Sequence, residues 1–137
     1  MRNISLLSLI LLILSSLNLS SCSYTPEALE SLDKTIKAYE RAIRWRDFNF
    51  ARALIKNPKE ISDYTRQRLQ NIKVTSYKVI NKIITPDYSK ADLIVDIRYY
   101  YDNSLVERVI TDRQTWVHDE NLNRWQLETP FPDFKLH

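Results

Sequence analysis

Residues 91–117, ADLIVDIRYYYDNSLVERVITDRQTWV, decide the fold of this chain. Apolar and polar residues alternate on both sides of Asp102-Asn103, which is the pattern of strands that bury one face. Asp and Asn suit a tight turn because both tolerate left-handed backbone angles. The stretch therefore predicts a β-hairpin of two strands, 91–101 and 105–117.

A turn at Asp102-Asn103 also predicts which residues lie opposite each other. The expected pairs are Leu93–Asp112, Val95–Ile110, Ile97–Arg108 and Tyr99–Val106 on one face, and Arg98–Glu107 and Asp92–Arg113 on the other. The second face carries pairs of opposite charge, which stabilise a solvated sheet surface. The first face is therefore expected to be buried, with Tyr99 and Tyr101 pointing inward and Tyr100 outward.

Two more strand-like runs, 72–84 and 124–129, complete the expected sheet. A turn near Glu120-Asn121 would place Trp116 opposite Trp125 and Gln114 opposite Leu127. The two tryptophans are then expected to form a cross-strand pair in the core. The strands follow one another as an antiparallel meander of four with one apolar face.

The segment before the strands has helical periodicity. Thr25-Pro26-Glu27 is typical of a helix start, with an N-cap, a proline at the first helical position and an acid near the positive end of the dipole. Apolar residues then recur three and four positions apart, at Leu29, Leu32, Ile36, Tyr39 and Ile43. This helix is expected to lie across the apolar face of the sheet.

Shorter helices are expected after a corner at residues 45–48. Asp47 is expected to cap a helix that ends at Asn57-Pro58 and carries the apolar residues Phe50, Ala51, Leu54 and Ile55. Residues 60–70 predict a third helix. The sequence thus predicts a single α+β domain, 26–137, in which N-terminal helices pack on a four-stranded antiparallel sheet.

The first 21 residues are expected to be a cleaved export signal. Arg2 gives a positive start, Ile4–Leu19 is apolar, and small residues precede Cys22. The apolar stretch is shorter than the roughly 20 residues that a membrane-spanning helix needs. The signal is therefore expected to direct export and not to remain as a transmembrane anchor.

The last residues of this signal, Leu19-Ser20-Ser21-Cys22, resemble the lipobox of bacterial lipoproteins. In that family the Cys carries a diacylglycerol thioether and its new amino group is usually acylated. The resemblance implies a membrane anchor of acyl chains, such as palmitate, on Cys22, followed by a tether, 22–25. An Asp after the Cys favours the inner membrane in this family, and Ser23 stands there instead. The resemblance therefore implies the periplasmic face of the outer membrane.

Composition excludes several other classes of protein. The formal net charge is +3 at pH 7, with basic and acidic residues interspersed, so the basic stripe expected for nucleic-acid binding is missing. The single cysteine excludes an intramolecular disulfide and a cysteine metal site. The absence of glycine excludes a glycine-cradled nucleotide site. No metal ion and no cofactor is predicted.

The order of elements in residues 26–129 is similar to nuclear-transport-factor-2-like and cystatin-like α+β folds. The aromatic positions that carry the resemblance are Trp45, Phe48, Tyr77, Trp116 and Trp125. It implies a cone-like sheet with a cavity under the first helix. That superfamily contains isomerase-like and dehydratase-like enzymes as well as non-catalytic binding and scaffold domains, so the resemblance leaves the function open.

Polar residues on the expected apolar face are candidates for a site. Arg108, Asp112 and Gln114 fall there, and a buried charge is costly unless it is paired. Isomerase-like members of the resembled superfamily use an Asp base and a Tyr donor, a role that Asp112 would match together with Tyr99, Tyr101 or Tyr77. The candidate cavity-lining residues are Tyr77, Tyr99, Tyr101, Arg108, Asp112, Gln114 and Trp116. A bulge, or salt bridges to Asp33 or Lys37, would accommodate the charges without catalysis.

Three further features are weaker candidates. His118 lies beside Asp119 and Glu120, but neighbouring strand residues point to opposite faces, so a surface turn is expected there and not a metal site. The outward face, with Tyr100, Val109, Thr111 and Thr115, would suit a docking surface or a homodimer. The prolines of the tail 130–134 forbid a helix and predict an extended segment that lies on the core or is offered to a partner.

These observations favour a non-enzymatic envelope lipoprotein whose domain binds a protein partner or a small ligand. The alternative is an isomerase- or dehydratase-like enzyme that uses Asp112 and a tyrosine. An open cavity beside a buried Asp112 would support the enzyme, and a filled interior would count against it. A third hypothesis is an accessory subunit of an envelope assembly or secretion complex. Its layout is similar to small lipoproteins of the outer-membrane barrel-assembly machinery, whose expected glycine-containing motif is absent.

Overall fold

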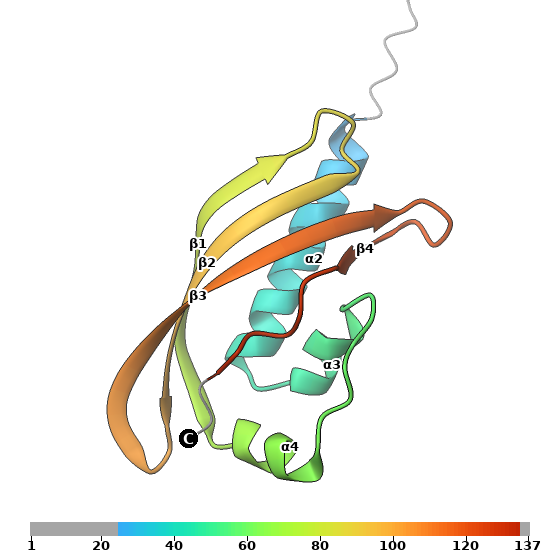
Figure 1. Cartoon of the computed structure of the whole chain (residues 1–137). Coiled ribbons are helices and arrows are strands. Elements are labelled where there is room, and N and C mark those ends of the chain that lie inside the picture. Colours follow the sequence, from blue (N-terminus) through green and yellow to red (C-terminus); the bar gives the residue numbers. More distant parts are fainter. Residues whose placement is uncertain (1–24, 135–137) are drawn as a thin grey trace, which may run out of the picture.

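A long helix, α2 (Thr25–Arg44), crosses one face of a four-stranded antiparallel sheet (Figure 1). The computed structural model describes residues 25–134. The other elements are α3 (Phe48–Ala53), α4 (Asp63–Leu69), β1 (Ile72–Ile84), β2 (Lys90–Tyr101), β3 (Ser104–Asp119) and β4 (Arg124–Leu127). The predicted α+β class, with helices before an antiparallel meander, is confirmed. The predicted export signal and Cys22 lie outside the described residues.

The core lies between α2 and the sheet. Leu32, Ile36, Tyr39 and Ile43 of α2 are buried, as their spacing predicts. On β2 every second residue from Ala91 to Tyr101 is buried, including Tyr99 and Tyr101, whereas Tyr100 is only partly covered. The predicted inner and outer faces are therefore confirmed for β2, whereas Val106, predicted to lie on the buried face of β3, is 62% exposed.

The pairing between β2 and β3 differs from the prediction by two residues. Tyr101 faces Ser104, as a tight turn requires, but the register shifts between Tyr99 and Tyr101. Beyond this bulge, Tyr99 faces Arg108 and Val95 faces Asp112. A shift of two residues preserves the face to which each side chain belongs, because side chains alternate with a period of two. The predicted strand partners are therefore displaced, although Arg98 and Glu107, predicted to pair on the outer face, still form an ion pair at 3.4 Å.

The pairing between β3 and β4 also differs from the prediction. Trp116 faces Leu127 and Trp125 faces His118, so the predicted cross-strand tryptophan pair is wrong. The turn lies further along the chain because the Asp119 carboxylate accepts hydrogen bonds from the backbone N–H groups of residues 121 and 122, at 3.0 and 3.1 Å. Trp116 instead packs edge-on against Tyr39 of α2, with 5.4 Å between ring centroids.

The short helices form as their capping residues predict. Asp47 caps α3 by accepting a hydrogen bond from the Phe50 N–H at 3.1 Å. Ser62 caps α4 through the Thr65 N–H, also at 3.1 Å. However, α3 ends at Ala53, before the predicted stop at Asn57-Pro58, and the Phe50 side chain is 45% exposed.

The C-terminal segment lies on the core, one of the two positions that its prolines allow. A short parallel bridge joins Ile55 to Leu127, and the Lys56 N–H donates to the Leu127 carbonyl at 2.8 Å. Phe134 is 3% exposed, and its ring meets the Tyr99 ring edge-on with 5.0 Å between centroids. The segment therefore closes the end of the core that α2 does not cover.

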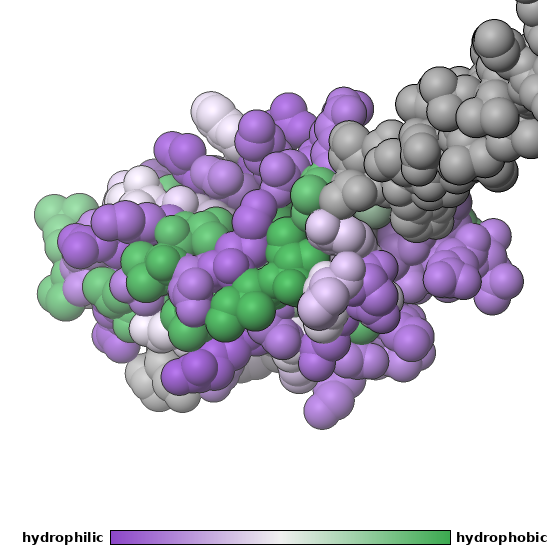
Figure 2. Space-filling model, turned by 90° about the horizontal axis from the view of Figure 1, so that it is seen from above, coloured by the Kyte–Doolittle hydropathy of each residue, from purple (hydrophilic) through white to green (hydrophobic). Residues whose placement is uncertain are grey.

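The outer face of the sheet is mixed in character. Thr111 and Thr115 donate hydrogen bonds to Asp96 and Asp92 across the strands, at 2.9 and 2.7 Å, while Val109 is 52% exposed. The part of the surface seen from above also shows hydrophobic residues flanked by hydrophilic ones (Figure 2). Whether this face docks a partner or forms a homodimer therefore stays a prediction.

Candidate functional site

A polar cluster lies on the inner face of the sheet beneath α2, with Gln114 at its centre. Gln114 is 1% exposed. Its Oε1 accepts hydrogen bonds from the Tyr77 hydroxyl at 3.2 Å and from Trp116 Nε1 at 3.1 Å. Its Nε2 donates to Asp112 Oδ2 at 2.8 Å and to the Tyr77 hydroxyl at 2.9 Å. The amide thus satisfies its neighbours in a place where an unpaired polar group would be costly.

Asp112 stands at the edge of this cluster. Burial raises the pKa of its carboxyl above the ordinary value of 3.8, and the hydrogen bond from Gln114 partly offsets that effect. The nearby Tyr39 hydroxyl is buried without a hydrogen-bond partner. Burial, together with the charge of Asp112, raises the Tyr39 pKa well above its ordinary value. Asp112 is therefore the one carboxyl group of the cluster, set close to buried hydroxyls.

We expect Asp112→Asn to raise the free energy of unfolding at neutral pH. Because the folded-state pKa of Asp112 is raised, its contribution to stability is fully present below the unfolded value of about 3.8 and is lost as the pH rises through the folded value. Asparagine cannot ionise and still accepts the Gln114 hydrogen bond. Urea denaturation should show a gain for the variant at pH 7 that vanishes near pH 3. A loss of stability at pH 7 would contradict this assignment.

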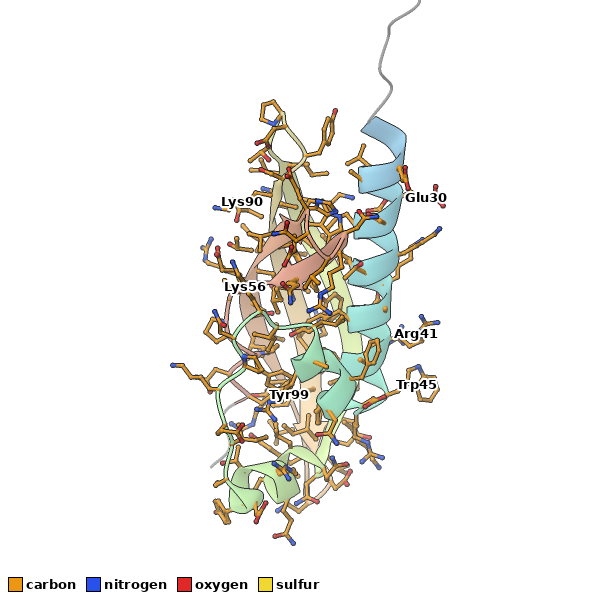
Figure 3. The ribbon with its side chains drawn as sticks, turned by 90° about the vertical axis from the view of Figure 1, so that its right-hand side faces the viewer. Glu30, Arg41, Trp45, Lys56, Lys90 and Tyr99 are labelled. Atoms are coloured by element: carbon orange, nitrogen blue, oxygen red, sulfur yellow. The ribbon has the colours of Figure 1, made fainter. Side chains whose placement is uncertain are left out.

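The catalytic arrangement suggested by the sequence is only partly assembled. Tyr77 reaches Asp112 through Gln114, but Tyr99 does not belong to the cluster, since Val95 is the partner of Asp112 and Tyr99 lies four residues further along β2. Four residues of strand correspond to about 13 Å. Tyr99 lies in the body of the domain and packs on Tyr101 and Phe134 (Figure 3). Of the candidate tyrosines, Tyr77 therefore lies closer to Asp112 than Tyr99 does.

The space around Asp112 is occupied by side chains. Tyr39 and Trp116 are fully buried and pack on each other beneath α2. Asp112 is not among the residues that line any of five hollows on the described surface. Of the candidate cavity-lining residues, Tyr101 and Arg108 line such a hollow, at the hairpin end of the sheet. A substrate beside Asp112 would therefore meet the packed rings of Tyr39 and Trp116.

The salt bridges suggested for the inner-face charges do not form. Asp33 binds Lys82 at 2.8 Å, and Arg108 lies over the Tyr101 ring, with its guanidinium carbon 5.3 Å from the centroid. The bulge in the hairpin lies between Tyr99, the strand partner of Arg108, and Tyr101, whose ring lies under the guanidinium. A bulge is thus present, as the sequence allowed, but it does not bring the charges fully to solvent, since the Arg108 Nε is buried.

An apolar groove runs along the C-terminal segment, and the sequence did not predict it. Beyond the bridge between Ile55 and Leu127, the chain segments 55–61 and 127–134 separate and leave a groove of about 360 Å³ between them. Its apolar lining comprises Ile55, Ile61, Leu69, Pro130, Phe131, Pro132 and Phe134. Charged residues of both signs, Arg52, Lys59, Glu128 and Asp133, stand beside it. An apolar floor with a charged rim is the usual composition of a protein-binding surface.

The structure also places His118 and Trp45, two further residues that the sequence singled out. His118 lies on β3 with its ring 5.2 Å from that of Trp125, and no group of ligand side chains among residues 25–134 is arranged to hold a metal ion. Trp45, one of the aromatic residues of the fold resemblance, is 79% exposed and projects from the end of α2 together with Arg41 (Figure 3). Phe48, Tyr77, Trp116 and Trp125 are buried as expected.

Comparison with known proteins gives this chain no relatives from which to transfer a function. Within residues 25–134, no helix is both long and apolar enough to cross a bilayer. No family model, no curated protein and no solved structure matches the chain.

Proposed function

We propose that this chain is a lipid-anchored bacterial envelope protein whose α+β domain binds an apolar segment of a partner protein, without catalysis. The observation that carries the proposal is the groove along the C-terminal segment. It has the size to take one or two apolar side chains, its floor is aliphatic and aromatic, and its rim carries charges of both signs. An accessory subunit of an envelope assembly is one form that such a protein takes.

The anchor part of the proposal rests on the sequence Leu19-Ser20-Ser21-Cys22. Cys22 precedes the first described residue of α2, Thr25, by three positions. Two or more acyl chains at Cys22 would hold the domain at the membrane surface, since two such chains anchor a protein stably. Ser23 supports the outer membrane, periplasmic side, as the location.

The proposal extends to the fold family. A long helix followed by short helices and a curved antiparallel meander is similar to nuclear-transport-factor-2-like and cystatin-like folds (Figure 1). Four of the five aromatic residues that carry the resemblance are buried: Phe48, Tyr77, Trp116 and Trp125. Under this proposal the space beneath the helix, open in the enzymes of that superfamily, is closed by Tyr39 and Trp116.

An enzyme of the isomerase type is the second candidate, and one observation favours it. Burial raises the pKa of Asp112, as a general base or acid in a pocket would require. A substrate would, however, have to displace Tyr39 or Trp116, which fill the space beneath α2. We therefore rank binding above catalysis.

Site-specific photo-crosslinking in intact cells tests the proposed function. A photoreactive residue replaces Lys59, which is exposed beside the groove, and in a matched variant it replaces Lys78, which is exposed on β1. We expect an adduct of one defined mass from position 59 and none from position 78. A Cys22→Ala form should lose its acyl chains, by mass spectrometry, and most of that adduct. Equal labelling at both positions would contradict groove binding, and an unacylated wild-type Cys22 would contradict the anchor.

A further inference from the structure

A polar hollow lies at the hairpin end of the sheet, apart from the groove. Its volume is about 240 Å³, and it is lined by Arg68, Asn71, Tyr101, Asn103, Ser104 and Arg108. These residues come from α4, from the turn between α4 and β1, and from the β2–β3 hairpin. The Asp102 N–H donates to the Asn71 carbonyl at 2.9 Å, which holds the hairpin turn against the segment between α4 and β1. The fold therefore fixes the walls of the hollow.

The hollow is rich in donors and poor in negative charge. Two guanidinium groups and two side-chain amides line it, and no carboxylate of the described residues does so. The neighbouring carboxylate, Asp102, is turned to other cations, with Lys73 at 3.1 Å and Arg46 at 4.0 Å. Glu107, on the same hairpin, is engaged by Arg98 and Thr75. Neither of these two carboxylates is thus directed at Arg108.

Among the described residues, no carboxylate forms an ion pair with the guanidinium of Arg108. The Arg108 Nε is also buried without a hydrogen-bond partner. Stacking on Tyr101 compensates a partly buried guanidinium only in part. A buried N–H group without a hydrogen-bond partner calls for an explanation. A bound anion would accept a hydrogen bond from the Arg108 Nε–H and would also pair with the guanidinium charge.

We propose that this hollow binds the phosphate group of a ligand, with Arg108 as the principal contact. The planar guanidinium donates two parallel hydrogen bonds to a phosphate, and the side chains of Asn71, Asn103 and Ser104 supply further donors around it. The volume corresponds to roughly eight water molecules, which leaves room for the group esterified to the phosphate. A soluble phosphate ester and a phospholipid headgroup both present negatively charged phosphate oxygens. The site is independent of the groove and of the proposed function.

Titration of the isotope-labelled, detergent-solubilised full chain with inorganic phosphate tests the site by NMR. We expect saturable shifts of the backbone amides of Asn71, Asn103 and Ser104, and none with chloride at the same ionic strength. Arg108→Met, which keeps the packing on Tyr101, should weaken phosphate binding at least about tenfold. Arg113→Met removes an exposed arginine from the outer face of the same strand and should leave the affinity unchanged within about twofold.

A second variant and a competition with lipid vesicles extend this test and distinguish the two possible sources of the phosphate. Arg108→Lys keeps the charge but loses the planar fork, so it should bind more weakly than wild type and more tightly than Arg108→Met. Phosphatidylglycerol vesicles that compete with inorganic phosphate would indicate a headgroup, and a lack of competition would indicate a soluble ligand. Shifts that do not saturate, equal affinity of the Met variant and wild type, or acetate binding as tightly as phosphate would overturn the proposal.

Discussion

Phe134→Ala is expected to lower the free energy of unfolding by about 3–5 kcal/mol, the cost of deleting a buried phenyl ring from a core. The side chain is 3% exposed, although only three residues follow it in the printed sequence. Its ring contacts those of Tyr99, Phe131 and Phe48, with centroid distances of 5.0, 5.9 and 6.0 Å. The loss would open a cavity between the sheet and α3, at the end of the core that α2 leaves uncovered.

Chemical denaturation followed by tryptophan fluorescence measures this loss, because Trp116 and Trp125 are buried reporters. Phe50→Ala is the matched control, since that ring is 45% exposed on α3 and should cost less than about 1 kcal/mol. Equal effects of the two substitutions would show that the C-terminal segment does not close the core.

Gln114→Leu is expected to cost about 2–4 kcal/mol even though leucine is similar in size. The substitution leaves the Trp116 Nε1–H without its acceptor and removes both hydrogen bonds between Gln114 and the Tyr77 hydroxyl. Each buried polar group left unpaired costs about 1–3 kcal/mol. It also removes the donor to Asp112, so the destabilisation should be greater at pH 7 than at pH 3, where that carboxyl is protonated.

Gln67→Leu provides the comparison for this effect, because Gln67 is exposed on α4 and has no hydrogen bond from its side chain among the described residues. Its effect should stay within about 0.5 kcal/mol. Thermal and urea unfolding of both variants at pH 7 and pH 3 would measure the two losses in free energy of unfolding. A stable Gln114→Leu variant would mean that the cluster is not a structural network.

The sequence was informative where a local period decides the outcome. The alternation in β2 and β3 predicted which side chains face the core, including Gln114, because a strand has a period of two. Asp47 predicted the start of α3 because capping depends on one side chain and its nearest backbone N–H groups. Both inferences use residues that are close together along the chain.

The sequence was less informative where distant segments decide the outcome. The strand partners were displaced by two residues because the bulge near Tyr100 and the long turn after Asp119 leave no clear mark in the alternation. The groove was missed because it arises from two segments, 55–61 and 127–134, that diverge after a single bridge. The apolar residues Phe131 and Phe134 were the available signal, but the spacing of a proline-rich segment does not show what it packs against.

Blocking the groove tests the binding account most directly. Asn57 is exposed and lines the groove, so Asn57→Trp should fill it without disturbing the core, while Asn81→Trp places the same bulk on the exposed part of β1. The measurement is the yield of the adduct formed in cells by the photoreactive residue at position 59. The account predicts a loss of at least about tenfold with Asn57→Trp and an unchanged yield with Asn81→Trp. An adduct that survives Asn57→Trp at full yield would contradict binding in the groove.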